Sequence, residues 1–143
     1  MVGDMESALQ ESLTAIPQLH YTHIPFADRY ELLPYYLACD YVCIPSYYDG
    51  MPNVMLEAAA LGVPMLASRA GGMADVLLDE HHGFTFEPGQ IDSWIVALKR
   101  AFAANLLQRE AMSEACHQLI VEELTAEAEL GRYHEMFSDM IIS

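Results

Sequence analysis

Residues 45–58 of this chain read Pro45-Ser46-Tyr47-Tyr48-Asp49-Gly50-Met51-Pro52-Asn53-Val54-Met55-Leu56-Glu57-Ala58. They follow a short apolar run, residues 40–45, that lacks alternation and is typical of a strand buried on both faces of a parallel sheet. After the loop, Asn53 is a candidate helix cap, and residues 53–61 have the alanine-rich composition of a helix. A buried strand, a loop and a helix in this order form the repeating unit of an α/β fold, so this stretch decides the fold class.

The same alternation extends in both directions along the chain. Further strands are predicted at residues 19–24, 63–67 and 84–86, and further helices at residues 5–15, 29–37 and 73–79. Beyond residue 89 the chain is predicted to be helical, with an apolar stripe expected to face the core: Ile91, Trp94, Ile95, Leu98 and Phe102. We therefore predict one domain over residues 1–143, with a Rossmann-like, doubly wound parallel sheet in residues 1–89 and a helical tail in residues 90–143.

Composition excludes several classes of protein. The chain has 143 residues, of which 53% are hydrophobic and 19% charged, and this balance excludes intrinsic disorder. No apolar run approaches the roughly 18 residues of a membrane span, so we expect no transmembrane segment. Lys and Arg total 6 against 21 Asp and Glu, which gives a net charge of −15. Binding to nucleic acid needs clustered basic residues, so we expect no nucleic-acid partner.

The cysteines and histidines point to a reduced, metal-free chain. Cys39, Cys43 and Cys116 form an odd set without a Cys-x-x-Cys pair, which is typical of reduced thiols in the cytoplasm. His20 and His23 are expected on opposite faces of a strand, so they cannot share a metal ion. We therefore predict a cytoplasmic location, no metal site and no cofactor.

The candidate site is the loop at residues 46–53, because ligands of parallel sheets bind beyond the carboxyl ends of the strands. Gly50 allows a close approach to the backbone, and free amides near residues 51–55 favour an anion. Asp49 and Glu57 flank these amides, which suits a nucleoside diphosphate sugar with hydroxyls on either side of its phosphates. The residues alone also fit a simple Asp-Gly turn followed by a solvated glutamate.

An ordered series of motifs reaches beyond this loop. It comprises Asp40, Pro45-Ser46, Asp49-Gly50-Met51-Pro52-Asn53, Glu57-Ala58, Gly62-Val63-Pro64, Gly71-Gly72, Gly83 and Pro88-Gly89. The series resembles the C-terminal donor-binding domain of retaining glycosyltransferases of the GT-B fold, in particular glycosyltransferase family 4, also called glycosyl transferases group 1. By itself, Gly71-Gly72 fits either a close approach to a ligand or a tight turn.

The resemblance implies a function and a set of site residues. The implied activity is transfer of a hexose from a nucleoside diphosphate sugar to a hydroxyl acceptor, with retention of the anomeric configuration. Asp49 is implied to contact the sugar, Glu57 the ribose hydroxyls, and the backbone amides between them the sugar and the distal phosphate. The implied substrate-binding residues are Asp49, Gly50, Met51, Asn53, Val54 and Glu57, with Gly3 and Phe26 as further rim positions, Phe26 near the nucleobase.

The chain also departs from the family pattern. Asp49 stands where the family has Glu, Pro25 where it has Gly, and Asp75 where Glu is common. The Arg and Lys that bind the diphosphate, and the whole N-terminal acceptor domain, have no counterpart in these residues. We therefore expect a fragment, truncated at its N-terminal side and inactive alone. The alternatives are a non-catalytic module that binds a nucleotide-sugar or a partner protein, and a GT-B hydrolase or epimerase.

Overall fold

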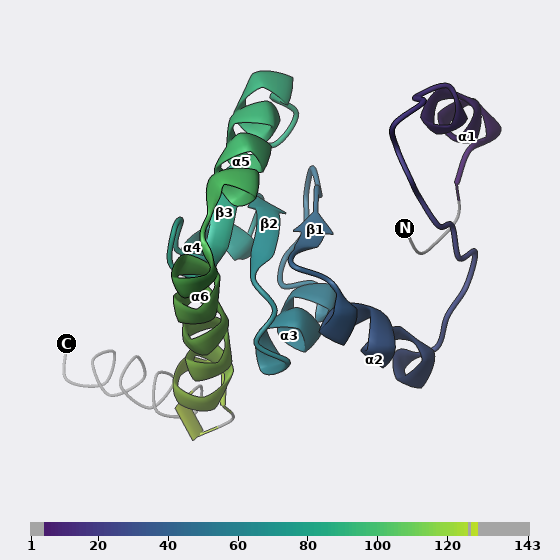
Figure 1. Ribbon diagram of the computed structural model, residues 1–143. Helices are drawn as coiled ribbons and strands as arrows, with labels where there is room; N and C mark the ends of the chain where they lie inside the picture. Colours follow the sequence, from purple (N-terminus) through teal and green to yellow (C-terminus); the bar gives the residue numbers. More distant parts are fainter. Residues whose placement is uncertain (1–4, 126, 129–143) are drawn as a thin grey trace. The chain divides into compact units, whose positions relative to one another are not determined.

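Figure 1 shows the computed structural model, which describes residues 5–125, 127 and 128. The chain forms two units, residues 1–38 and residues 39–143. The described part of the first unit contains the helices α1 (Ser7–Thr14) and α2 (Arg29–Ala38). Both confirm the helices predicted at residues 5–15 and 29–37.

Helix α2 begins with a reciprocal cap, which explains why it forms despite an internal proline, Pro34. The Asp28 carboxylate accepts hydrogen bonds from the amides of Tyr30 (2.8 Å) and Glu31 (2.9 Å). The Glu31 carboxylate in turn accepts from the amide of Asp28 at 3.0 Å. These bonds satisfy the donors that a helix leaves unpaired at its first turn.

The strand predicted at residues 19–24 is wrong. Within that segment only Ile24 forms an isolated bridge, and the rest has no regular structure. A strand needs a neighbour for its backbone hydrogen bonds, and the described part of the first unit contains no other strand. The β-branched and aromatic composition of the segment therefore does not suffice to form one.

The second unit is built on a parallel sheet in the order β1 (Val42–Ile44), β2 (Met65–Ser68), β3 (Gly83–Phe86). Val42 pairs with Met65, and Met65 pairs with Gly83. All residues of the central strand β2 are buried, so both of its faces are covered. The loop after β1 rises above the arrowhead of that strand in Figure 1 and returns to helix α3 (Asn53–Ala60). Strand, loop and helix therefore follow one another as the sequence predicts.

Helix α5 (Ile91–Ala103) covers one face of the sheet, but not with the whole predicted stripe. Its buried residues, Ala97 and Ala101, share a core cluster with Leu66, Phe84, Phe86 and Met112. Trp94 and Leu98 pack against this cluster, whereas Ile91 is 72% exposed and Phe102 is 86% exposed. The small alanines let the helix approach the sheet closely, so the inward face is centred on them, and the prediction that the full stripe faces the core is wrong.

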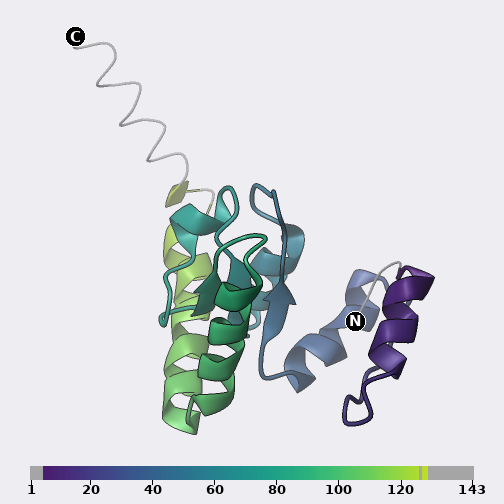
Figure 2. The same ribbon diagram turned by 90° about the horizontal axis from the view of Figure 1, so that it is seen from above.

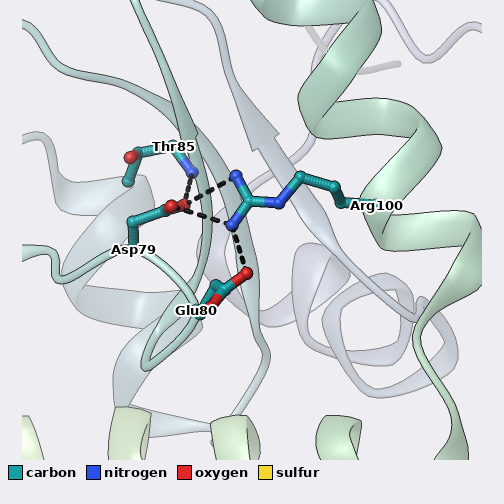
Figure 3. A network of polar contacts seen from close by, with 4 residues as sticks. All are labelled: Asp79, Glu80, Thr85 and Arg100. Carbon is teal, nitrogen blue, oxygen red and sulfur yellow. Dashed lines mark hydrogen bonds and ion pairs between the residues drawn. The ribbon is translucent and has the colours of Figure 1, made fainter.

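Arg100 fastens α5 to the loop before β3 (Figure 3). Its Nη2 lies 2.8 Å from Oδ2 of Asp79 and 2.7 Å from Oε1 of Glu80. The guanidinium carbon also lies 4.8 Å from the centre of the Phe84 ring. Burial alone would raise the pKa of Asp79, but hydrogen bonds from Arg100 and from the Thr85 amide, together with the charge of Arg100, hold it below the ordinary value.

The remaining helices complete the second unit. Helix α4 spans Met73–Val76 and is shorter than the predicted 73–79, because Leu77 is extended. Helix α6 (Leu106–Gln118) starts with a capping box between Asn105 and Gln108, and α5 and α6 follow each other as neighbours in Figure 2. A π-helical turn, η1 (Leu119–Glu123), extends α6. Residues 126 and 129–143 of the predicted helical tail lie outside the described residues.

A search of the described residues for membrane spans finds no helix with both the length and the apolar character needed to cross a bilayer.

Candidate functional site

Six of the predicted site residues lie in the loop and helix that follow the carboxyl end of β1. Asp49, Gly50 and Met51 belong to the β1–α3 loop, residues 45–52, and Asn53, Val54 and Glu57 belong to α3. The side chains of Asp49 and Glu57 are half-buried, whereas the four residues between them in the predicted set are exposed. One loop and the helix that follows it therefore carry two carboxylates on either side of accessible backbone.

The N-cap of helix α3 lies one residue earlier than predicted. Pro52, not Asn53, is the N-cap, with φ −67° and ψ 143°, and its carbonyl accepts from the amides of Met55 (2.9 Å) and Leu56 (3.3 Å). The proline ring fixes this φ, so Asn53 becomes the first helical residue, and its side chain makes no cap. The prediction of Asn53 as cap is wrong.

This start of α3 leaves two donors open. The amides of Asn53 and Val54 have no acceptor among the described residues, whereas the amide of Met55 is already bound to Pro52. Unpaired amides at a helix N-terminus attract negative charge, because the helix dipole adds to their partial charges. Within the range 51–55 expected from the sequence, Met51 also has no acceptor among the described residues, whereas Pro52 has no N–H and Met55 is bonded.

Gly50 has no structural reason to be glycine within the described protein. Its φ is not in the left-handed region, and a Cβ built on it meets no atom within 4 Å. The space beside its α-carbon is therefore open, and a ligand can approach the backbone there.

Strand β2 and the segment after β3 help to hold the loop. The Ser68 hydroxyl at the end of β2 donates to the carbonyl of Ser46 at 2.5 Å and lies 3.4 Å from the carbonyl of Ile44. The ring of Tyr47 lies beside Gly89, where an added Cβ would come within 3.2 Å of Cε1. The loop is therefore held at its first residues by β2 and by the segment that follows β3.

Gly71 and Gly72, here called the glycine turn, contact the same loop, and sequence reasoning missed this role. A Cβ on Gly71 would overlap the carbonyl oxygen of Asp49, and one on Gly72 would lie 2.7 Å from the carbonyl oxygen of Gly50. The two glycines therefore do more than form a tight turn, because they pack against the backbone of the β1–α3 loop. Its signal in the sequence was the position of two glycines just after the strand that neighbours β1.

Comparison with known proteins identifies the family. The sequence profile described as "Glycosyl transferases group 1" matches residues 1–104. This chain belongs to the group 1 glycosyltransferases. The resemblance drawn from the motif series between Asp40 and Gly89 is confirmed.

Relatives of this group 1 glycosyltransferase chain are longer than the chain itself. It is 31% identical over 106 residues to the Escherichia coli UDP-Gal:alpha-D-GlcNAc-diphosphoundecaprenol alpha-1,3-galactosyltransferase, covering 74% of this chain and 27% of that enzyme. The crystallised C-terminal domain of a group 1 glycosyltransferase, LpcC from Francisella tularensis, is 25% identical with a TM-score of 0.60, over 73% of this chain and 53% of that domain. The chain therefore spans about a quarter of the E. coli enzyme.

A third comparison shows the fold. HepE from Anabaena, solved in complex with UDP, matches with a TM-score of 0.68 at 19% identity, over 96% of this chain and 40% of that protein. The predicted fold class, a Rossmann-like α/β parallel sheet of the GT-B glycosyltransferases, is confirmed.

The other predicted positions of this glycosyltransferase chain lie apart from the β1–α3 loop in sequence. Phe26 belongs to the first unit and is 81% exposed, and Gly3 lies outside the described residues. Arg69, after β2, forms an ion pair of 3.5 Å with Glu87, after β3. Among the residues that the structure describes, no group of three His, Cys, Asp or Glu side chains is placed to hold a metal ion.

Proposed function

We propose that this chain is the donor-binding part of a retaining glycosyltransferase of the hexosyl type, which transfers a sugar from a nucleoside diphosphate to a hydroxyl acceptor. One observation carries the proposal: the free amides of Asn53 and Val54 and the open space at Gly50 lie, along the chain, between the acidic residues Asp49 and Glu57. The UDP bound by HepE and the UDP-sugar in the name of the E. coli relative support this class of ligand.

Each residue then has a role that its chemistry supports. The amides of Asn53 and Val54 receive the distal phosphate, since both are donors at a helix N-terminus. The carboxylate of Asp49 accepts from sugar hydroxyls and that of Glu57 from the ribose hydroxyls. The backbone amides of Gly50 and Met51 contribute to binding the sugar and the distal phosphate. Phe26 is proposed near the nucleobase and Gly3 on the rim.

The loop favours the reaction by acting on the leaving group. Breaking the bond between the anomeric carbon and the phosphate oxygen leaves negative charge on the diphosphate. Backbone amides that already point at this oxygen stabilise the charge without reorganising, which is the largest single contribution in many enzymes. Two carboxylates that bind hydroxyls at either end also hold the donor in one orientation toward an acceptor.

We further propose that residues 1–143 form one nucleotide-sugar-binding domain whose acceptor is bound by an N-terminal domain outside them. The greater length of the relatives supports this division, as does the likeness to the C-terminal domain of LpcC. A cytoplasmic location is part of the proposal, and the three cysteines, none of which forms a disulfide, support it. No turnover is expected from these residues alone.

The experiment is a calorimetric titration of UDP, ADP and GDP into the wild-type chain and the Glu57→Gln variant. The substitution keeps the size of the side chain but removes the charge that strengthens hydrogen bonds to ribose. We expect binding of one nucleotide to weaken by at least about tenfold, or about 1.4 kcal/mol, with a melting curve close to the wild type.

Glu110→Gln is the matched control, because Glu110 is an exposed glutamate on α6 away from the loop. It should leave both affinity and melting unchanged. Equal nucleotide affinity in the wild type and Glu57→Gln would show that the Glu57 carboxylate does not bind the ribose, and the ribose assignment would then be wrong.

A further inference from the structure

We propose that the glycine turn, Gly71 and Gly72, is a positioning element that sets the direction of the amides of Gly50 and Met51. The proposal deepens the proposed function, because it rests on that function for what these amides bind. The contact between the glycine turn and the β1–α3 loop is a packing contact between the loops that follow β2 and β1.

The glycine turn meets the backbone of the β1–α3 loop, not its side chains. The nearest atom to a Cβ built on Gly71 is the carbonyl oxygen of Asp49, with the carbonyl carbon at 2.8 Å. The nearest atom to a Cβ built on Gly72 is the carbonyl oxygen of Gly50, at 2.7 Å. Both carbonyls therefore have their oxygens on the side of the glycine turn.

The direction of each carbonyl fixes the direction of the N–H group in the same peptide. In a trans peptide the C=O and N–H bonds point in opposite directions. Because the carbonyls of Asp49 and Gly50 face the glycine turn, the amides of Gly50 and Met51 face away from it. Neither amide has an acceptor among the described residues, and the space in the Cβ direction of Gly50 is open.

The glycine turn is itself firmly held. The carbonyls of Ala70, Gly71 and Gly72 accept from the amides of Met73 (3.2 Å), Ala74 (3.1 Å) and Asp75 (3.3 Å). These bonds tie the turn to the start of α4, so it presents a fixed surface to the β1–α3 loop. A rigid support beneath two peptides keeps their donors in one direction before any ligand arrives, which lowers the cost of ordering them on binding.

The two glycines differ in a way that makes a sharp test possible. Gly71 has φ +51°, so any side chain there strains its own backbone. Gly72 has φ −64° and ψ −18°, which an alanine adopts without strain. In Gly72→Ala the added methyl group therefore acts on the Gly50 carbonyl alone.

Gly62→Ala is the matched control. Gly62 has φ +66°, and its added Cβ would meet the Ser113 hydroxyl oxygen at 3.0 Å, so the substitution strains the fold. It lies after the C-terminal end of α3, whereas the β1–α3 loop precedes the helix. A general loss of stability therefore appears in both variants, and a change in the direction of the loop amides appears only in Gly72→Ala.

The first measurement is the amide NMR spectrum of the free, full 143-residue chain. Gly72→Ala should shift the amide signals of Gly50 and Met51, and Gly62→Ala should leave them in place. If these signals stay at their wild-type positions in Gly72→Ala, the glycine turn does not shape the loop and the proposal is overturned. Should Gly72→Ala fail to fold, one glycine inserted after Gly72 removes the contact without adding a side chain, and the same shifts are expected.

The second measurement is affinity for UDP, ADP and GDP by calorimetry. We expect Gly72→Ala to bind the preferred nucleotide at least about tenfold more weakly than the wild type, and Gly62→Ala to bind it within about twofold. Wild-type affinity in Gly72→Ala overturns the ligand-orienting role. If the wild type binds none of the three nucleotides, the proposed function is wrong, and so is the ligand-orienting role of the glycine turn. The amide NMR spectrum still decides separately whether the glycine turn shapes the loop.

Discussion

Gly50 and Gly83 show how the same residue type serves two different purposes in one unit. Gly83 has φ +137°, and an added Cβ would lie 2.6 Å from the amide nitrogen of Met65, so the paired strands exclude any side chain there. Gly50 has an ordinary φ and open space around it. Packing therefore explains the first glycine, whereas the open space at the second suits the close approach of the ligand that we propose.

The first prediction compares alanine at these positions. Gly50→Ala should change the free energy of unfolding by less than about 0.5 kcal/mol, as is usual for open surface sites, yet weaken nucleotide binding. Gly83→Ala should lower the free energy of unfolding by several times the change expected for Gly50→Ala. The reason is that β3 cannot keep its register with β2 when residue 83 carries a side chain. Urea unfolding and calorimetric titration of both variants measure this. If Gly50→Ala binds the nucleotide with the wild-type affinity, the β1–α3 loop is not part of the binding site.

Residue types allowed the loop to be found from sequence but not its support. Asp49, Gly50 and Glu57 stand out because two carboxylates flank a glycine just after an apolar strand. The contact of Gly71 with Asp49 could not be predicted, since it depends on how two loops pack after neighbouring strands. The cap of α3 was misplaced for a local reason: the fixed φ of Pro52 outweighed the capping preference of Asn53.

At the scale of elements, the second prediction concerns the contact of α5 with the loop before β3. Arg100→Gln should lower the free energy of unfolding by about 1 kcal/mol at pH 7, a modest value because solvent screens the pairs with Asp79 and Glu80. Lys99→Gln, at an exposed neighbour on the same helix, is the control and should have little effect. Equal stability of the two variants would show that the Arg100 network contributes nothing.

The pH dependence of this network has a definite sign. The folded protein holds the pKa of Asp79 below its ordinary value of 3.8, so the carboxylate adds stability that is fully present above that value. The contribution is lost as pH falls through the lowered pKa. The difference between the wild type and Arg100→Gln in urea unfolding should therefore be constant from pH 7 to about pH 5 and shrink below about pH 4. A difference that grows on acidification contradicts the network.

The spacing of apolar residues predicts where a helix or strand lies more reliably than it predicts which of its faces is buried. The spacing of apolar residues predicted α5 correctly, but Ile91 and Phe102 are exposed and the alanines Ala97 and Ala101 face the sheet. The predicted stripe was identified from large apolar side chains, whereas close packing of a helix on a sheet favours small side chains. The strands β1 and β2 were predicted because they lie in short apolar runs, whereas the segment at 19–24 was predicted from its β-branched and aromatic residues. Within that segment, only Ile24 forms an isolated bridge.

At the scale of the whole molecule, the third prediction is that the 143-residue chain transfers no sugar. It spans 27% of its E. coli relative, and we propose that acceptor binding lies outside it. Incubation of the purified chain with UDP-, ADP- and GDP-hexoses and a panel of hydroxyl acceptors should yield no glycosylated product. Turnover by the purified chain would overturn the proposed division of labour and place acceptor binding within these residues.

The central claim is that the amides at the start of α3 bind the distal phosphate of a nucleoside diphosphate. The most direct test follows the amide NMR signals of Asn53 and Val54 while the chain is titrated with UDP, UMP and uridine. UDP should move both signals saturably, UMP less so, and uridine should leave them in place, because only UDP supplies the distal phosphate to these unpaired donors. If UDP leaves the signals of Asn53 and Val54 unmoved, or uridine moves them as much, the assignment of the phosphate to this loop is wrong.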